Sequence, residues 1–181
     1  MAVKLARRAQ RVQPFYVMEL AKTAARLAAE AGPSGRSMLY LNIGEPDFTA
    51  PALVQAAAER AIRDGRSQYT QATGLPALRE AISGWYASRF GLDIDPGRIV
   101  VTAGASAALQ LACLALIEAG DEVLMPDPSY PCNRQFVQAA EGTAVLIPSG
   151  PDDRFQLSAA QVEQAWGPAT RGVLLASPSN P

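Results

Sequence analysis

Histidine is absent from all 181 residues of this chain. That absence excludes serine–histidine triads, most zinc sites and the most common acid–base side chain. Lysine is almost absent too, because Lys4 and Lys22 are the only two and both lie near the amino terminus. The two cysteines, Cys113 and Cys132, lack the spacing of a metal site, so we expect reduced thiols. Cys113 lies in an apolar run, which indicates a small core residue.

Charge of one sign and long apolar runs are also lacking. The formal net charge is −1, which gives no electrostatic reason to expect nucleic acid as a partner. No run is long and apolar enough to suggest a membrane span or a signal sequence, so we expect a cytoplasmic protein that binds no membrane. Hydrophobic residues make up 49% of the chain and charged residues 18%, a composition typical of a globular domain.

The first half of the chain predicts mainly helices. Apolar residues at helical spacing indicate a helix over 14–31 that ends before a Gly-Pro pair, and the run MLYLNIG at 38–44 is typical of a short strand. Further helices are predicted over 51–65 and 76–90, and Gly91 is placed to close the second of them. Pro-Gly at 96–97 then predicts a turn.

The second half alternates between strands and helices. The predicted strands are 99–102, 121–126, 143–148 and 172–177, and the helices between them are 105–120, 131–142 and 158–166. Ser158 with Gln161 forms a capping-box pattern at the start of the last helix. Strands this apolar, separated by helices, predict an α/β fold of three layers, with a parallel sheet covered on both faces and a helical segment before it.

Three loops follow predicted strands and carry candidate binding residues. The turn TAGAS at 102–106 has small residues that leave backbone N–H groups accessible at a helix start, which favours either an anion such as phosphate or a turn chosen only for packing. Tyr130 would offer its ring to a planar ligand or cap the edge of the core. Asn180 would donate a hydrogen bond to a ligand or serve only as a turn residue. Because parallel strands end at one edge of a sheet, the three loops together favour a ligand site.

Four sequence blocks resemble the pyridoxal-phosphate-dependent aminotransferases of class I/II. They are PFYVMEL at 14–20, LNIGEPDFTAP at 41–51, YTQATGLPALREAI at 69–82, and the long block VTAGAS…DPSYP at 101–131. The order and spacing of the blocks carry the resemblance, which covers nearly the whole chain from about Val12. It implies the fold-type I architecture with an incomplete large domain, divided into an arm and small-domain segment at 1–50 and a cofactor-binding domain at 51–181.

The resemblance also implies roles for individual residues. Gly104, Ala105 and Ser106 would cradle the phosphate of pyridoxal 5′-phosphate through backbone N–H groups and a hydroxyl. Tyr130 would stack on the pyridine ring, and Asn180 would hydrogen-bond its phenolic oxygen.

Two further residues would complete the site by the same resemblance. Tyr69 would reach the phosphate of a neighbouring subunit's cofactor, which implies a homodimer, and Gly44 would contact the substrate carboxylate through its backbone. Turn formation and packing are the alternative reasons for both residues.

The implied activity is transfer of an amino group between an amino acid and a 2-oxo acid, within amino acid metabolism. The family's Schiff-base lysine matches neither Lys4 nor Lys22, and the chain stops at Pro181 in a loop after a predicted strand. We therefore expect a fragment that has no catalytic residue of its own and is inactive alone. A lyase or decarboxylase with the same cofactor, a non-catalytic remnant that dimerises, and, more remotely, a nucleotide-binding oxidoreductase are alternatives.

Overall fold

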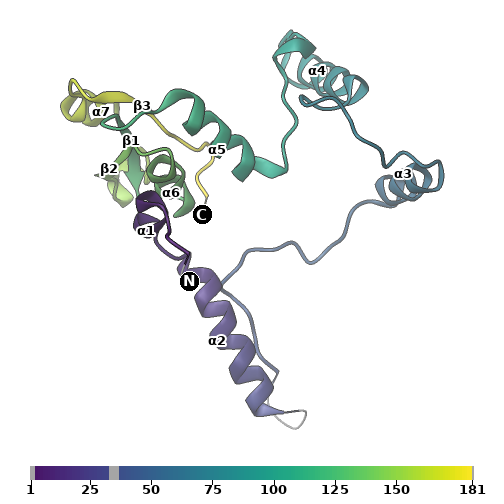
Figure 1. The fold of residues 1–181 in the computed structure, drawn as a ribbon, viewed down its shortest axis with the longest axis horizontal. Helices are drawn as coiled ribbons and strands as arrows, with labels where there is room; N and C mark the ends of the chain where they lie inside the picture. Colours follow the sequence, from purple (N-terminus) through teal and green to yellow (C-terminus); the bar gives the residue numbers. More distant parts are fainter. Residues whose placement is uncertain (1–2, 33–36, 181) are drawn as a thin grey trace. The chain divides into compact units, whose positions relative to one another are not determined.

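A computed structural model describes residues 3–32 and 37–180 and divides the chain into two compact units (Figure 1). The sheet unit contains the residues up to Asn42 and those from Ala105 onward. The helical unit is Ile43–Gly104.

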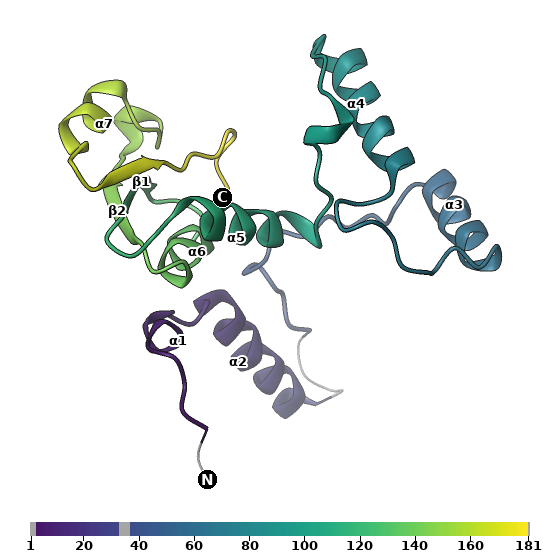
Figure 2. The same ribbon diagram turned by 45° about the horizontal axis from the view of Figure 1, so that its top comes forward.

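The sheet unit is built on three parallel strands: β1 Glu122–Asp127, β2 Thr143–Pro148 and β3 Thr170–Val173. Their spatial order is β2-β1-β3, so β1 lies in the middle and Glu122 pairs with Thr143 on one side and with Thr170 on the other. Parallel neighbours need crossover connections, and α6 and α7 provide them, at Cys132–Ala139 and Ala159–Ala165. Figure 2 shows the same unit from a second direction. The predicted α/β class and parallel pairing are confirmed.

The core of the sheet unit lies between β1 and two helices. Val123 and Met125 share one face of β1 and pack in a cluster with Cys113 of α5, which runs Gly104–Leu116, and with Val137 of α6. Met125 and Val137 have no exposed surface, and burial raises the pKa of the Cys113 thiol. Cys113 is therefore the core residue that the sequence predicts. Leu124 is also fully buried, and alternation along the strand turns it to the opposite face.

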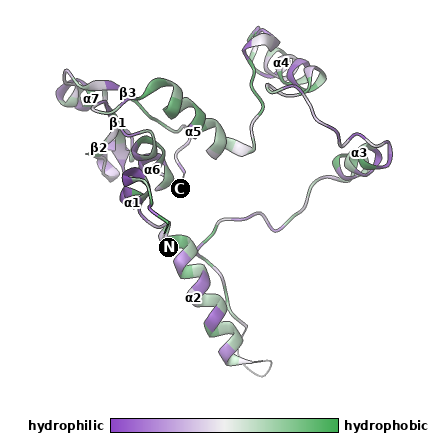
Figure 3. Cartoon of the chain, viewed as in Figure 1, coloured by the Kyte–Doolittle hydropathy of each residue, from purple (hydrophilic) through white to green (hydrophobic). Residues whose placement is uncertain are grey.

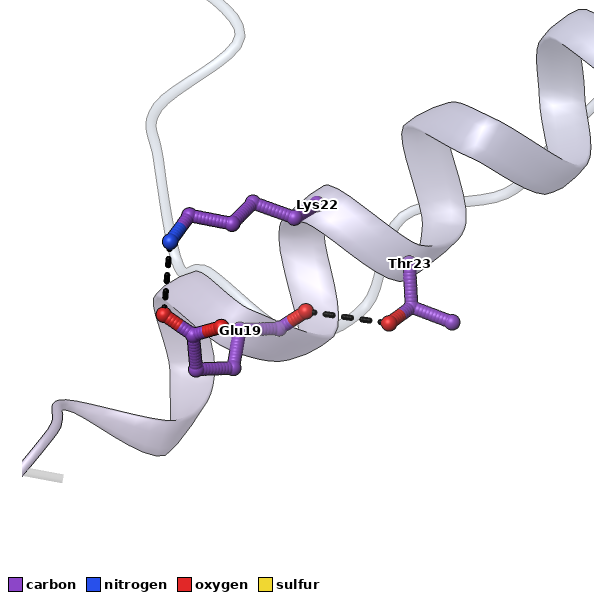
Figure 4. Close-up of polar contacts among 3 residues, drawn as sticks. All are labelled: Glu19, Lys22 and Thr23. Atoms are coloured by element: carbon purple, nitrogen blue, oxygen red, sulfur yellow. Dashed lines mark hydrogen bonds and ion pairs between the residues drawn. The ribbon is translucent and has the colours of Figure 1, made fainter.

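The amino-terminal segment of the sheet unit is helical. It contains α1, Arg7–Arg11, and α2, Tyr16–Ala31, and α1 lies against α6. Within α2 the Lys22 ammonium is 2.7 Å from a Glu19 carboxylate oxygen, and the Thr23 hydroxyl donates to the Glu19 carbonyl (Figure 4). Both ends of the Glu19–Lys22 ion pair are exposed to solvent, so it contributes little to stability.

The helical unit contains α3, Ala52–Arg63, and α4, Pro76–Phe90. Proline at the first position of α4 and Gly91 in the left-handed conformation after it delimit the helix, as the sequence predicts. A 3₁₀ turn, η1 at Pro96–Arg98, follows where Pro-Gly predicts a turn. The Ser83 hydroxyl donates to the Ile94 carbonyl at 2.6 Å and ties α4 to the chain that precedes η1.

Two predicted strands are wrong. Residues 38–44 are irregular, and the Asn42 amide donates to the Val17 carbonyl of α2 at 3.4 Å. Residues 99–102 are also irregular, because Val101 makes one backbone bond, to the Thr73 carbonyl, instead of a ladder with a neighbouring strand. The strand predicted at 172–177 is displaced, since pairing with β1 begins at Thr170 and the strand ends at Val173.

The helices of the described ranges are not built to cross a bilayer, since none combines sufficient length with sufficient apolar character. The most hydrophobic of them is α5, which is coloured as hydrophobic along much of its length in Figure 3. The helix α5 ends at Leu116, four residues before the predicted end at residue 120. In the loop that follows, the Glu118 backbone N–H donates to the Asp121 carboxylate.

Candidate cofactor-phosphate site

The start of α5 is an exposed turn with unpaired backbone donors. Gly104 is the first helical residue and has a φ of 81°, a conformation that favours glycine. Its N–H donates to the Thr102 carbonyl at 2.8 Å, and the Thr102 hydroxyl donates to the Gly104 carbonyl at 2.9 Å. The N–H groups of the next residues, Ala105 and Ser106, have no acceptor inside the helix because they belong to its first turn. Three of the predicted residues therefore share one turn, which is suited to an anion.

The segment before this turn is held by Arg79 of α4. The Arg79 guanidinium donates twice to the Pro96 carbonyl, in one case from Nε at 2.9 Å, and its Nη1 donates to the Thr73 hydroxyl at 3.2 Å. Thr73 in turn accepts a backbone hydrogen bond from Val101 at 3.0 Å. Thr73 and Arg79 lie in the 69–82 block and Val101 in the 101–131 block, whereas Pro96 lies in neither. Their residue types alone predict no role, because the contacts among them form only in the folded chain.

Gly74 has a packing function beside this network. Its φ is 99°, and a Cβ at this position would lie 2.6 Å from Val101 Cγ2, closer than real Cβ atoms approach. Gly74 thus lets Val101 lie directly against the backbone of the segment before α4. This explains the glycine of the 69–82 block by close packing.

Tyr130 follows β1 and is half-buried. The Phe15 ring approaches it edge-on, with 6.2 Å between ring centroids and 74° between planes. A side-chain hydrogen bond with Cys132, reinforced by burial and by the charge that the thiol can carry, raises the pKa of the Tyr130 phenol. The phenol therefore stays protonated and neutral over a wider range of pH than a free tyrosine.

The remaining predicted residues lie in loops. Asn180 is exposed in the segment that follows β3. Tyr69 is fully exposed in the helical unit, at 108% of its reference surface, and Gly44 of the same unit has open space around its α-carbon. Gly104, Ala105 and Ser106 are consecutive and share the first turn of α5, and the roles predicted for all six cofactor residues and for Gly44 stay predictions. Among the described residues no group of acidic, cysteine or histidine side chains forms a metal site.

The chain resembles known proteins along nearly its entire length. The family model for aminotransferase class I and II matches residues 36–181. The valine–pyruvate aminotransferase of Mycobacterium tuberculosis is 40% identical over 94% of this chain and 42% of its own length. The aspartate/prephenate aminotransferase of Nitrosomonas europaea is 37% identical over 99% of this chain and 44% of its own length.

Solved structures agree with these sequence matches. The crystal structure of an aminotransferase from Mycobacterium tuberculosis aligns with a TM-score of 0.88 and 39% identity, over 99% of this chain and 45% of the other. The aspartate aminotransferase of Thermus thermophilus with maleate aligns with a TM-score of 0.91 and 30% identity, over 99% and 46%. The chain spans less than half the length of these relatives. With 146 of its residues, 36–181, inside the family match and its fold shared with these enzymes, the chain belongs to the class I and II aminotransferase family.

Proposed function

We propose that the chain supplies the phosphate-binding side of an aminotransferase that moves an amino group between an amino acid and a 2-oxo acid with pyridoxal 5′-phosphate. The observation that carries the proposal is the turn at the start of α5, where small residues and a left-handed Gly104 leave backbone donors exposed.

The phosphate would be held at one place in the chain. Ala105 would contribute its backbone N–H group and Ser106 its hydroxyl, and the Gly104 N–H would exchange its bond to the Thr102 carbonyl for one to the phosphate. Exposed amides at a helix start carry partial positive charge, which complements a phosphate dianion. The donor set therefore fits the phosphate of the cofactor.

The ring would be oriented by two loop residues. When bound, the pyridine ring acts as an electron sink for the carbanion formed at the substrate. Tyr130 would lie against the ring face, and the Asn180 amide would donate to its phenolic oxygen.

Substrate and partner contacts complete the proposal. The Gly44 backbone would contact the substrate carboxylate, and Tyr69 would reach the phosphate site of a second subunit in a homodimer. The full exposure of Tyr69 supports a contact outside its own unit. The proposed domains are 1–50 and 51–181, and the proposed compartment is the cytoplasm.

Neither lysine is assigned a covalent step. Lys22 is held by Glu19 on the solvent side of α2, and Lys4 lies in the exposed segment before α1. The residues named above would bind and orient the cofactor and the substrate. We expect the 181-residue chain to show no transamination by itself.

A comparison of two ligands tests the proposal. We expect pyridoxal 5′-phosphate to bind the chain at least about tenfold more tightly than pyridoxal, equivalent to ~1.4 kcal/mol, because only the former carries the phosphate. Ser106→Ala should reduce this ratio, whereas Ser88→Ala, an exposed serine of α4, should leave it unchanged. Equal affinities for the two ligands, measured by absorbance titration, would contradict the proposal.

A further inference from the structure

The side chain of Arg79 joins two segments that are separate in sequence. Its guanidinium donates to the Pro96 carbonyl in η1 and to the Thr73 hydroxyl before α4. The side chain is half-buried, and both acceptors are neutral. Because a guanidinium presents its donors in a rigid planar fork, it fixes the spacing of the two segments.

The segment that Arg79 holds reaches the phosphate turn by direct contacts. The Thr73 carbonyl accepts the Val101 N–H at 3.0 Å, and Gly74 leaves room for the Val101 side chain. Val101 immediately precedes Thr102, whose hydroxyl bonds to the Gly104 carbonyl at 2.9 Å. A continuous series of hydrogen bonds and close contacts therefore connects the guanidinium to the first residue of α5.

We infer that Arg79 is a positioning residue for phosphate binding: through Thr73 and Val101 it holds the Thr102–Gly104 turn in the conformation that exposes the α5 donors. Arg79 itself does not touch the phosphate in this arrangement. The inference rests on the proposed function, and it adds that phosphate affinity depends on the hydrogen bonds of Arg79 to Pro96 and Thr73. Amides that are already in place when the anion arrives lose less entropy on binding, so loosening the turn lowers affinity.

Variants of Thr73 and Arg79 test the inference in the full 181-residue chain. The readout is the ratio of the affinity for pyridoxal 5′-phosphate to that for pyridoxal, which isolates the phosphate contribution. We expect Arg79→Ala to reduce this ratio about tenfold, or ~1.4 kcal/mol. Thr73→Val removes the hydroxyl acceptor at nearly constant shape and should lower the ratio. Thr73→Ser keeps the hydroxyl and should leave the ratio close to that of the unmodified chain.

The double variant and a matched control exclude a general loss of stability. Arg79→Ala combined with Thr73→Val should be little worse than Arg79→Ala alone, because residues of one network are not additive. Arg89→Ala removes an arginine from the exposed end of the same helix and should leave the ratio unchanged. Full additivity of the two variants, or an equal effect of Arg89→Ala, would overturn the inference.

Failure of the inference is distinguishable from failure of the proposed function. If Ser106→Ala lowers the ratio and Arg79→Ala does not, the phosphate site stands and the inference is wrong. If Ser106→Ala has no effect on the ratio, the proposed site is wrong. Amide hydrogen exchange then tests, without any ligand, whether Arg79 holds the Thr102–Gly104 turn in place. Faster exchange at Val101 and Gly104 in Arg79→Ala than in Arg89→Ala supports the positioning, and unchanged exchange overturns it.

Discussion

Gly74 has no Cβ, and the Val101 side chain packs against its α-carbon where a Cβ would lie. Gly74 also has a φ of 99°, which other residues rarely adopt. Gly74→Ala must therefore displace Val101 and adopt a strained backbone conformation. We expect the free energy of unfolding of the helical unit to fall by roughly 1–3 kcal/mol, measured by urea unfolding with Trp85 fluorescence as the probe.

Gly84→Ala is the matched control for this variant. Gly84 lies inside α4 with open space around its α-carbon, so a methyl group there meets no neighbour. Alanine is the better helix former, and the free energy of unfolding should rise by about 0.5–1 kcal/mol. A neutral Gly74→Ala, or a loss of stability in Gly84→Ala as large as that in Gly74→Ala, would contradict the packing argument.

The hydrogen bond between Tyr130 and Cys132 predicts a pH dependence. It raises the pKa of the phenol, so its contribution to stability is complete below the ordinary tyrosine pKa of about 10 and is lost as pH rises through the raised pKa. Cys132→Ala should return the Tyr130 pKa toward its ordinary value and weaken this loss. Because the chain has five tyrosines, the phenolate titration is recorded as a difference from Tyr130→Phe.

Cys132→Ser provides the control for this titration. A serine hydroxyl can keep the hydrogen bond to the phenol, so the Tyr130 pKa should stay raised. An unchanged pKa in Cys132→Ala would show that burial alone sets the value.

Among the elements, α7 is stabilised at its first turn by a capping box. The Ser158 hydroxyl accepts from the Gln161 backbone N–H at 3.2 Å, and the Gln161 side chain accepts from the Ser158 N–H at 2.8 Å. Ser158→Ala removes the hydroxyl that accepts from the Gln161 N–H, and it should lower the free energy of unfolding of the sheet unit by ~1 kcal/mol. Ser158→Asp, which also caps helices, should retain most of the stability in the same thermal or urea measurement. Equal losses in the two variants would exclude capping as the cause.

Helix ends were predictable from sequence because the signals that set them are local. The capping box of Ser158 and Gln161 and the left-handed Gly91 both lie within one turn of the helix that they delimit. The predicted helices at 14–31, 51–65 and 76–90 therefore match α2, α3 and α4 closely.

Strand ends were not predictable in the same way, since a strand exists only where a partner pairs with it. The apolar run at 99–102 looked like a buried strand, yet Val101 bonds only to Thr73 across a loop. Hydropathy placed the last strand at 172–177, whereas the register with Glu122 moves it to begin at Thr170. These positions depend on residues far away in sequence.

In the candidate site, too, local features were predictable from sequence and contacts between distant segments were not. Gly104, Ala105 and Ser106 are consecutive, so the sequence alone could place them in one turn. The support from Arg79 crosses from α4 to η1 and to Val101, and only the folded chain brings these segments into contact. Tyr69 and Gly44 were assigned only by resemblance, and their roles stay predictions.

For the whole molecule, the surface of α5 predicts self-association. Leu111, Leu114 and Leu116 are each more than half exposed on a helix that is apolar along much of its length (Figure 3). Adjacent exposed leucines favour association with any apolar surface, including that of another copy. We expect the chain to form larger species with rising concentration in light-scattering measurements, and Leu111→Glu with Leu114→Glu to reduce them.

Ala115→Glu is the control for this effect. It adds negative charge on the same helix and keeps all three leucines. If Ala115→Glu suppresses association as strongly as the leucine variants do, charge repulsion rather than the loss of apolar surface is the cause.

The central place of β1 in the sheet also governs when the sheet can assemble on the ribosome. Of the three strands in the described residues, β1 is synthesised before the other two and pairs with both, since the order is β2-β1-β3. The backbone of β1 on the side of β3, from Glu122 to Leu124, has no partner strand until Thr170–Val173 leaves the exit tunnel. Pairing between strands so distant in sequence is slow. The nascent chain thus has an interval in which β1 is open to chaperones, and slower translation between β2 and β3 would lengthen it.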